Sequence, residues 1–444
     1  MSHSEQLIIS KSELTGGDVT IQGSKNSGLA LLIATCLTTD SITLNNMPKI
    51  EDIFVINHIL ANIGAKVDWT DDNLTVDTSG IPNGEIPLDL SNMIRPSYYF
   101  VGALINRFGK VKLGYPGGDK IGKRPIDMHI AGLRALGADV NLYEDYYTVE
   151  VNGRLKGSSF MFNRKSCGTT INLILAGVLA QGKTTLYNCA LDPEVVDLVQ
   201  LLCKMGAKIK GAGTTVITIE GVESLHGAVH SVIPDRFMAG LFMICAGMSK
   251  APIRIHKVIP KHVESVIQKL EEMGLTIDIE GETITAHPAK KLASTVVFAD
   301  MYPAFPSDLQ QPMTVLLTQA DGQSVVVDQV WKHRFALCKE LDLMGANTNV
   351  SNHGLSIIHG PTPLKGTSVY ANDIRGGLAL VFAGLIATGS TTINNCYQIH
   401  RGSQSIISDM VKLGGFIEEV QSEKKQTLDI GSEQMSTVKN INSL

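Results

Sequence analysis

VESVIQKLEEMGLTI, residues 263–277, combines an amphipathic helix pattern with a helix-ending glycine. A glycine in that position usually adopts the left-handed conformation that ends a helix, and the β-branched residues after Gly274 predict a strand. The same arrangement recurs five more times, with glycines at Gly64, Gly137, Gly206, Gly345 and Gly414. Successive glycines are 68 to 73 residues apart. This nearly fixed interval predicts a chain of six repeats.

Each repeat also contains an earlier helix pattern that is apolar on most sides, as in LALLIATCL (29–37) and LALVFAGLIA (378–387). We expect these helices to be buried, whereas the glycine-ended helices keep a polar face toward solvent. Alternating or β-branched segments such as STTINNC (390–396) predict a strand between the two helices. The expected unit is therefore strand, buried helix, strand, outer helix, strand.

Units of this length are too short to be independent domains and too long for the common solenoids. Six of them predict an α/β protein with two lobes of three repeats each, divided near HSVIPDR (230–236). One expected lobe contains residues 1–22 and 234–422, and the other contains residues 23–233. Two chain crossings would join the lobes, with a cleft between them. Residues 423–444 are polar and predict a loose tail.

The composition excludes several classes of function. Hydrophobic residues at 44% and charged residues at 18% are typical of a folded protein, and a net charge of -5 gives no reason to expect a nucleic-acid partner. The seven cysteines include no CxxC pair, and the Cys and His residues show no metal-ligand spacing, so we expect no metal and no cofactor. No signal-peptide or membrane-spanning pattern is visible. The prediction is a cytoplasmic protein without a membrane partner, monomeric or weakly homo-oligomeric.

The segments just before the buried helices are rich in Gly, Ser, Thr, Asn, Asp and Pro, which favour helix starts. Several of these segments add a cation: Lys25, Arg95, Lys165, Arg236 and Arg375. Helix N-termini attract anions through their free N–H groups and their dipole. If the repeats aim these ends at one cleft, the cleft suits phosphate or carboxylate groups. The alternative is that the polar residues are only helix caps.

GYPGGDKIGKRPIDMH, residues 114–129, is a basic stretch with two adjacent glycines and Asp119 at its centre. It is either a solvated surface turn or a catalytic lid whose glycines serve as hinges. The lid is what the family resemblance of the flanking segments implies.

The chain resembles the enolpyruvyl transferases over residues 6–421. The segments that carry the resemblance are GSKNSGLALL (23–32), GGDKIGKRPIDMHIAGLRALGA (117–138), DPEVVDL (192–198), PAFPSDLQ (303–310), HRF (333–335) and IHRG (399–402). The resemblance implies a two-lobed inside-out α/β barrel, with helices inside and sheets outside. Within the family it is strongest to the branch that transfers the enolpyruvyl group of phosphoenolpyruvate to UDP-N-acetylglucosamine, the first committed step of peptidoglycan synthesis.

The resemblance implies catalytic roles for Lys25, Asp119, Asp308 and Arg401. Lys25 is similar in place to the phosphate-binding lysine of the family, and Arg401 to one of its arginines. Asp308 matches the acid that takes the proton of the acceptor hydroxyl. A carboxylate among so many cations is expected to stay ionised, which suits a base.

The resemblance also implies a set of substrate contacts: Asn26, Arg95, Arg124, Pro125, Ile126, Asp127, Met128, Lys165, Ser166, Gly168, Val330, Arg334 and Asp373. Asn26 would hold the sugar, and Arg124 and Met128 would flank the uracil. The diphosphate would lie on Ser166 and Gly168 at the start of a helix. For Asp373, a structural pairing with a nearby arginine is an equally open reading.

In most of the family the position of Asp119 is a cysteine that takes part in proton transfer and product release. An aspartate can donate a proton if exclusion of water raises its pKa, and a minority of the family carries it. The thiol that fosfomycin alkylates is thereby absent. We expect an active enzyme that is insensitive to fosfomycin.

Three segments depart from the commonest family pattern and border the expected sugar site: ADMYPAFP (299–306), VWKHRF (330–335) and IRGG (374–377). One alternative is therefore a paralogue that acts on another nucleotide or nucleoside in a secondary-metabolite pathway. The enzyme of the shikimate pathway fits less well, because RPIDMH and KSCG would be unexplained. A second alternative is a non-catalytic sugar-nucleotide-binding protein, although such a protein has no need of Lys25, Asp308 and Arg401.

Overall fold

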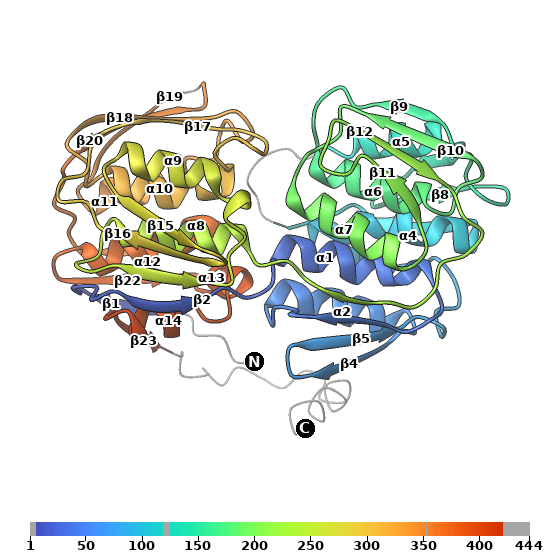
Figure 1. The fold of residues 1–444 in the computed structure, drawn as a ribbon, viewed down its shortest axis with the longest axis horizontal. Coiled ribbons are helices and arrows are strands. Elements are labelled where there is room, and N and C mark those ends of the chain that lie inside the picture. Colours follow the sequence, from blue (N-terminus) through green and yellow to red (C-terminus); the bar gives the residue numbers. More distant parts are fainter. Residues whose placement is uncertain (1–5, 119–124, 352, 421–444) are drawn as a thin grey trace.

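The computed structural model describes three stretches of the chain: residues 6–118, 125–351 and 353–420. Figure 1 shows two lobes side by side, each with its own hydrophobic core. The core of the continuous lobe is built from residues between 29 and 232. The core of the discontinuous lobe combines residues 7–21 with residues between 237 and 413. The polar tail predicted for residues 423–444 lies outside the described residues.

The interior of both lobes is helical. The buried helices are α1 (Lys25–Ala34), α4 (Tyr99–Phe108) and α6 (Cys167–Gly177) in the continuous lobe, and α8 (Arg236–Ala246), α10 (Gln310–Leu317) and α12 (Ile374–Ile386) in the discontinuous lobe. Every residue of α8 and of α10 is buried, and the other four helices are buried over most of their length. These helices coincide with the apolar patterns of the six repeats, which confirms that prediction.

A second helix of each repeat lies further out: α2 (Glu51–Asn62), α5 (Asp127–Ala135), α7 (Pro193–Lys204), α9 (Glu264–Glu272), α11 (Ala336–Leu343) and α14 (Ile406–Lys412). The glycine that follows each of them has a φ between +90° and +105°. This left-handed conformation confirms the predicted helix ends. In α9 only Val266, Ile267 and Leu270 are buried, as expected for an amphipathic helix. Most of α7 is buried, because it packs against α1.

The sheets lie on the outside of the helices (Figure 1). The strands of the continuous lobe are β3 (Ile42–Asn45), β4 (Lys66–Thr70), β5 (Asn73–Asp77), β6 (Lys110–Gly114), β7 (Asp139–Leu142), β8 (Tyr146–Glu150), β9 (Ser159–Met161), β10 (Lys183–Tyr187), β11 (Lys208–Lys210), β12 (Val216–Glu220) and β13 (Val229–Ser231). They form sheets in the orders β13-β3-β5-β4, β6-β8-β7 and β11-β12-β10-β9.

The discontinuous lobe has the same plan. Its strands are β1 (Gln6–Ser10), β2 (Gly17–Thr20), β14 (Ile253–His256), β15 (Thr276–Glu280), β16 (Thr283–His287), β17 (Val296–Ala299), β18 (Gly322–Asp328), β19 (Asn347–Ser351), β20 (Leu355–Gly360), β21 (Ser368–Tyr370), β22 (Ser390–Asn394) and β23 (Phe416–Val420). They form sheets in the orders β15-β16-β14-β2, β17-β18-β20-β19 and β21-β22-β1-β23. Strand β1 pairs antiparallel with both β22 and β23, and β2 pairs parallel with β14.

Most of the repeats contain one strand more than the sequence predicted. In five of the repeats an antiparallel hairpin follows the outer helix, as with β4 and β5 or β15 and β16, where a single strand was predicted. The prediction of a single strand was wrong, because a turn of a few residues lets two strands follow one helix: only Asp71 and Asp72 separate β4 from β5, and Asp71 has a φ of +51°. The remaining short elements are η1 (Thr35–Leu37), α3 (Leu88–Ser91), η2 (Arg95–Tyr98), η3 (Pro260–His262), η4 (Ser307–Leu309) and α13 (Tyr397–Gly402).

Two crossings of the chain join the lobes, and they run beside each other. Gly23 and Pro234 form an antiparallel bridge. Ser24 N donates to Ile233 O at 2.7 Å, and Asp235 N donates to Gln22 O at 2.9 Å. A Cβ atom at Gly23 would lie 1.8 Å from the carbonyl oxygen of Asn46, so only glycine fits at the first crossing. The crossings bring the N-termini of α1 and α8 together at the boundary between the lobes.

None of the helices in the described part of the chain is both long and apolar enough to cross a bilayer.

Candidate active site

The buried helices begin at the boundary between the lobes. Four of them have a side-chain cap: Ser24 on α1, Ser166 on α6, Asp235 on α8 and Asp373 on α12. Helices α4 and α10 instead follow the tight turns η2 and η4. The expectation of capped helix starts is therefore correct for four of the six. The cations at these starts are a separate feature, because most of them line one cavity.

A cavity of about 250 Å³ lies between the lobes. Seven of the expected site residues line it: Lys25, Asn26, Arg95, Gly168, Asp308, Arg334 and Arg401. Together with Arg375, the described lining contains five cationic side chains and three acidic ones, the latter being Asp52, Glu194 and Asp308. The excess of positive charge and the converging helix starts suit a ligand with more than one negative charge.

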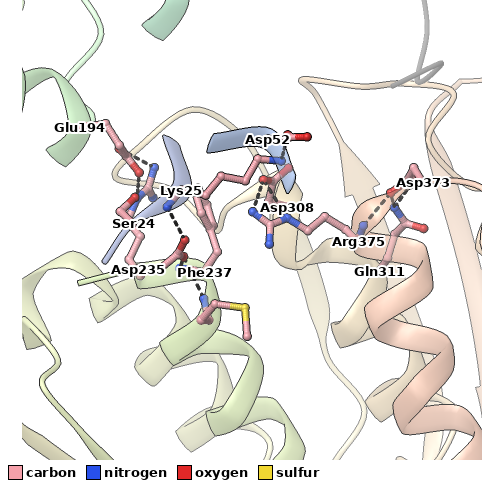
Figure 2. Close-up of polar contacts among 12 residues, drawn as sticks. Ser24, Lys25, Asp52, Glu194, Asp235, Phe237, Asp308, Gln311, Asp373 and Arg375 are labelled. Atoms are coloured by element: carbon pink, nitrogen blue, oxygen red, sulfur yellow. Dashed lines mark hydrogen bonds and ion pairs between the residues drawn. The ribbon is translucent and has the colours of Figure 1, made fainter. Parts of the chain in front are cut away.

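Lys25 and Arg401 come from different lobes and share one carboxylate. Lys25 Nζ lies 2.6 Å from Asp52 Oδ2, and Arg401 Nε donates to Asp52 Oδ1 at 2.9 Å. Figure 2 shows Lys25 and Asp52 directed toward each other. Burial raises the pKa of Asp52, but the charges of Lys25 and Arg401 outweigh it and hold that pKa below its usual value. Asp52 is thus ionised and neutralises one of the two cations.

Asp308 is held by two arginines. Arg334 Nη1 donates to its Oδ1 at 2.8 Å, and Arg375 Nε donates to its Oδ2 at 3.0 Å. Burial opposes ionisation, but the charges of Arg375 and Arg334 hold the pKa of Asp308 well below its usual value. In this arrangement Asp308 is a very weak base.

Asp373 contacts Arg334 but does not line the cavity. It caps α12 by accepting from the backbone N–H groups of Arg375 and Gly376, and it also accepts from Arg334 Nη2 at 3.2 Å. Gln311 Nε2 donates to it at 3.0 Å (Figure 2). The pairing with Arg334 places Asp373 in a supporting position rather than in the cavity lining.

A second ion cluster joins the lobes at the start of α8. Arg236 donates to Glu194 Oε1 at 3.0 Å and to Asp192 Oδ1 at 3.1 Å, and it lies over the rings of Phe237 and Tyr302. Burial and the neighbouring Glu194 carboxylate outweigh the charge of Arg236 and raise the pKa of Asp192 to about 6. This cluster fixes α7 of one lobe against α8 of the other.

The wall of the cavity on the side of the continuous lobe is aromatic and tightly packed. Tyr98 and Tyr99 line it, and the Arg95 guanidinium lies 5.3 Å from the Tyr98 ring centroid. A Cβ atom at Gly168 would lie 2.3 Å from the Tyr98 hydroxyl, so a larger residue there would displace the Tyr98 ring from the cavity wall. Cys167 also lines the cavity, but burial raises the pKa of its thiol well above the usual value. A protonated thiol is a poor nucleophile, which agrees with a packing role.

Among the described residues, no group of three or more His, Cys, Asp or Glu side chains is placed to hold a metal ion.

Comparison with known proteins identifies the family. A model of the family EPSP synthase (3-phosphoshikimate 1-carboxyvinyltransferase) matches residues 9–410. UDP-N-acetylglucosamine 1-carboxyvinyltransferase 2 of Bacillus subtilis (strain 168) is 42% identical over 414 residues, which cover 93% of this chain and 96% of that protein. The protein of the same name from Listeria innocua is 40% identical over 412 residues, with coverage of 93% and 97%. The chain belongs to the EPSP synthase family of enolpyruvyl transferases.

Solved structures of the family share the fold. The enolpyruvyl transferase NikO from Streptomyces tendae superposes with a TM-score of 0.86 at 27% identity, covering 95% of this chain and all of that one. EPSP synthase from Acinetobacter baumannii superposes with a TM-score of 0.72 at 18% identity, with coverage of 94% and 100%. This confirms the two lobes predicted from the repeats and the enolpyruvyl-transferase fold implied by the family resemblance.

The remaining expected site residues of this enolpyruvyl transferase do not line the cavity: Pro125, Ile126, Asp127, Met128, Lys165, Ser166, Val330 and Asp373. Met128 is buried in the core of the continuous lobe, and Asp127 lies exposed with Arg164 3.6 Å away. Val330 N donates to Asp328 Oδ1 at 2.9 Å, outside the cavity. Asp119 and Arg124 lie outside the described residues.

Several cavity residues of the transferase were not predicted. Asp52 was missed because its partner Arg401 is 349 positions away, a pairing that no local pattern reveals. Glu194 lies in the DPEVVDL segment that supported the family resemblance, but no role was assigned to it. Trp331 was noted only as a departure from the family pattern. It lies in the cavity lining.

Proposed function

We propose that this enolpyruvyl transferase moves the enolpyruvyl group of phosphoenolpyruvate to the 3-hydroxyl of UDP-N-acetylglucosamine and releases phosphate. This reaction is the first committed step of peptidoglycan synthesis. The observation that carries the proposal is the interlobe cavity, in which Lys25, Arg401 and the arginine pair around Asp308 meet. The relatives that bear this activity in their names are 40% to 42% identical over nearly the whole chain.

The chemistry divides into addition and elimination. In the addition, the acceptor hydroxyl oxygen bonds to C2 of phosphoenolpyruvate, the hydroxyl proton passes to a base, and C3 takes up a proton. In the elimination, C3 gives up a proton, the double bond re-forms and phosphate leaves. The protein has to bind a phosphate and a carboxylate, to accept one proton and to supply another. Guanidinium groups bind both anions through paired hydrogen bonds, which assigns Arg334, Arg375 and Arg401 to that task beside Lys25.

The same arginines control the basicity of Asp308. While both of them donate to its carboxylate, its pKa lies far below that of a useful base. An anionic substrate competes for the same N–H groups. Once Arg334 and Arg375 turn toward the substrate anion, Asp308 loses its partners and its pKa rises. Asp308 then becomes a base only when phosphoenolpyruvate is bound, so that the acceptor is activated only when it can react.

We propose that Asp119 supplies the proton to C3. The assignment rests on its place in the GGDKIGKRP segment, because the residue lies outside the described part of the chain. Two further features of the proposal rest on the sequence alone. The enzyme acts in the cytoplasm, where both substrates are made, and it works as a monomer or a weak homo-oligomer.

A second candidate function is enolpyruvyl transfer to another nucleotide or nucleoside. The segments ADMYPAFP, VWKHRF and IRGG, which depart from the common family pattern, support it, and the fold is shared with a further enolpyruvyl transferase, NikO, with a TM-score of 0.86 over 95% of the chain. The identity to NikO is 27%, compared with 40% and 42% for the Listeria innocua and Bacillus subtilis UDP-N-acetylglucosamine enzymes, which makes this the weaker candidate.

The test is phosphate release from phosphoenolpyruvate with UDP-N-acetylglucosamine as the acceptor, and with UMP, uridine and shikimate 3-phosphate in parallel. We expect release only with the UDP-sugar, and its loss in Asp119→Asn. Release with UMP or uridine alone would replace the first candidate by the second. Wild-type protein that binds the UDP-sugar without any release would instead be a binding protein.

A further inference from the structure

A buried hydrogen-bond network lies in the first turn of α1, the helix that begins with Lys25. Ser27 Oγ donates to Asp197 Oδ2, and His230 Nε2 lies 2.7 Å from Asp197 Oδ1. Ser27, Asp197 and His230 are 0%, 1% and 4% exposed, and none of them lines the cavity. Burial of a carboxylate is costly unless hydrogen bonds compensate for it. Asp197 is therefore a specifically partnered group outside the cavity and close to a cation that lines it.

The network joins three separate elements. Ser27 lies on α1, Asp197 on α7, and His230 on β13 at the approach to the second crossing. Ile233 N also donates to Asp197 Oδ2, at 3.3 Å. One carboxylate thus holds the helix start and the crossing at the same time.

The crossing in turn fixes the backbone of Lys25. Ile233 O accepts from Ser24 N at 2.7 Å, and Asp235 Oδ2 accepts from Lys25 N at 3.0 Å, as Figure 2 shows for Asp235. Asp235 Oδ1 at the same time caps α8 of the other lobe through Phe237 N at 2.9 Å. Displacement of the crossing would therefore move the start of α1, and Lys25 with it.

We propose that Asp197, held by Ser27 and His230, is a positioning residue that sets the place of Lys25 in the anion site. The proposal rests on the proposed function for the identity of the anion, phosphoenolpyruvate. His230 Nδ1 has no hydrogen-bond partner among the described residues, so the ring makes its polar contact through Nε2 alone. This single contact ties the carboxylate to β13. A network that served only stability would have no effect on anion affinity beyond its effect on folding.

The variants that test this are Ser27→Ala, His230→Gln and Asp197→Asn. The matched control is Thr35→Val at the other end of α1. Thr35 is also fully buried, and its Oγ1 donates to Leu32 O at 2.7 Å, remote from Lys25. Calorimetric titration with phosphoenolpyruvate and with inorganic phosphate gives the affinities, and thermal unfolding gives the midpoint Tm of each variant.

We expect Ser27→Ala to weaken the binding of both anions by about tenfold, since small displacements of a positioned group have effects of this order or more. Thr35→Val should lower Tm by about as much as Ser27→Ala does, but it should leave the affinities for both anions unchanged. If Asp197→Asn does not fold, Ser27→Ala and His230→Gln still test the positioning role, because each removes one partner of Asp197. Equal anion affinities of Ser27→Ala, His230→Gln and wild type would overturn the proposal. Wild-type protein that binds neither anion would overturn it as well.

Steady-state kinetics separates this proposal from the proposed function. In Ser27→Ala the KM for phosphoenolpyruvate should rise about tenfold, while the KM for the UDP-sugar stays the same. If wild type shows no turnover with the UDP-sugar but Ser27→Ala still loses anion affinity, the proposed function is wrong and the positioning role stands. If turnover is found and the variants retain full anion affinity, the positioning role is wrong and the function stands.

Discussion

Lys25 and Asp52 form a buried ion pair in which Lys25 Nζ lies 2.6 Å from Asp52 Oδ2. Arg401, from the other lobe, binds the same carboxylate, so Asp52 links the two lobes. The Asp52 carboxylate therefore supplies, beside these two cations, the negative charge that a bound substrate anion would supply. The same carboxylate holds the two cationic side chains close together. Their combined positive charge exceeds the charge of Asp52, which leaves an attraction for a further anion.

Asp52→Asn should lower the free energy of unfolding by about 3 kcal/mol, because it leaves Lys25 and Arg401 buried without their counter-ion. Inorganic phosphate should then stabilise the variant more than it stabilises wild type, since the anion replaces the missing carboxylate. Urea unfolding with and without phosphate measures both effects. The control is Asp18→Asn in an exposed cluster with Arg254, where phosphate should make no difference. Equal stabilisation of Asp52→Asn and wild type by phosphate would contradict the prediction.

Asp308→Asn should reduce kcat by about 100-fold or more, because it removes the base. Its affinity for phosphoenolpyruvate should rise, since Arg334 and Arg375 no longer have to leave a carboxylate in order to bind the substrate. Single-turnover kinetics and calorimetric titration separate the two effects. Asp300→Asn, an exposed change in the preceding loop, serves as the control. Weaker binding of phosphoenolpyruvate by Asp308→Asn would show that the arginines need Asp308 in order to bind the substrate.

The Asp192 carboxyl should make stability depend on pH. Its pKa is about 6 in the folded protein and near 3.8 in the unfolded chain, so the folded state holds the proton more tightly. Its contribution to stability is complete below about pH 4 and is lost as the pH rises through about 6, at no more than ~1.4 kcal/mol per pH unit.

Asp192→Asn removes this dependence. Between pH 5 and pH 7.5, wild type should lose stability relative to the variant, as measured by urea unfolding over that range. Asp145→Asn, an exposed bend residue, should follow wild type throughout. Parallel curves for wild type and Asp192→Asn would refute a raised pKa for this carboxyl.

Fosfomycin should not inactivate the enzyme, because Asp119 offers the drug a carboxylate instead of a thiol. Asp119→Cys should become sensitive and should carry one covalent adduct. Peptide mass spectrometry locates the adduct, and the exposed Cys203 reports on non-specific alkylation in the same sample. Potent inactivation of wild type, or labelling of Asp119 itself, would disprove the prediction.

Helix ends and burial could be predicted from the sequence because both depend on local rules. Gly274 and its five counterparts have positive φ values since a left-handed helix end excludes most other residues. The apolar patterns of the inner helices predicted their burial, because the spacing of apolar residues along a helix is also a local feature. The hairpins after the outer helices were missed, although Asp71 and Asp72 between two alternating segments are a turn signal.

The site could be predicted only in part. Lys25, Asp308 and Arg401 lie in recognisable segments, and the structure brings all three to the cavity. The pairings of Asp52 with Arg401 and of Arg236 with Glu194 join distant segments from opposite lobes, so only the folded structure reveals them. Charge and spacing show which residues are available, whereas the three-dimensional packing decides which of them neutralise each other.

The position of β1 has a consequence for folding during synthesis. Gln6 lies opposite Asn394 in the sheet, and their side chains hydrogen-bond across a separation of 388 positions. The continuous lobe can complete its core as soon as its last strand has left the ribosome. Strand β1 has to wait, unpaired, until β22 and β23 have been made. During the synthesis of the intervening segments, β1 is an apolar strand without its partners, and such an unpaired strand favours aggregation of the nascent chain.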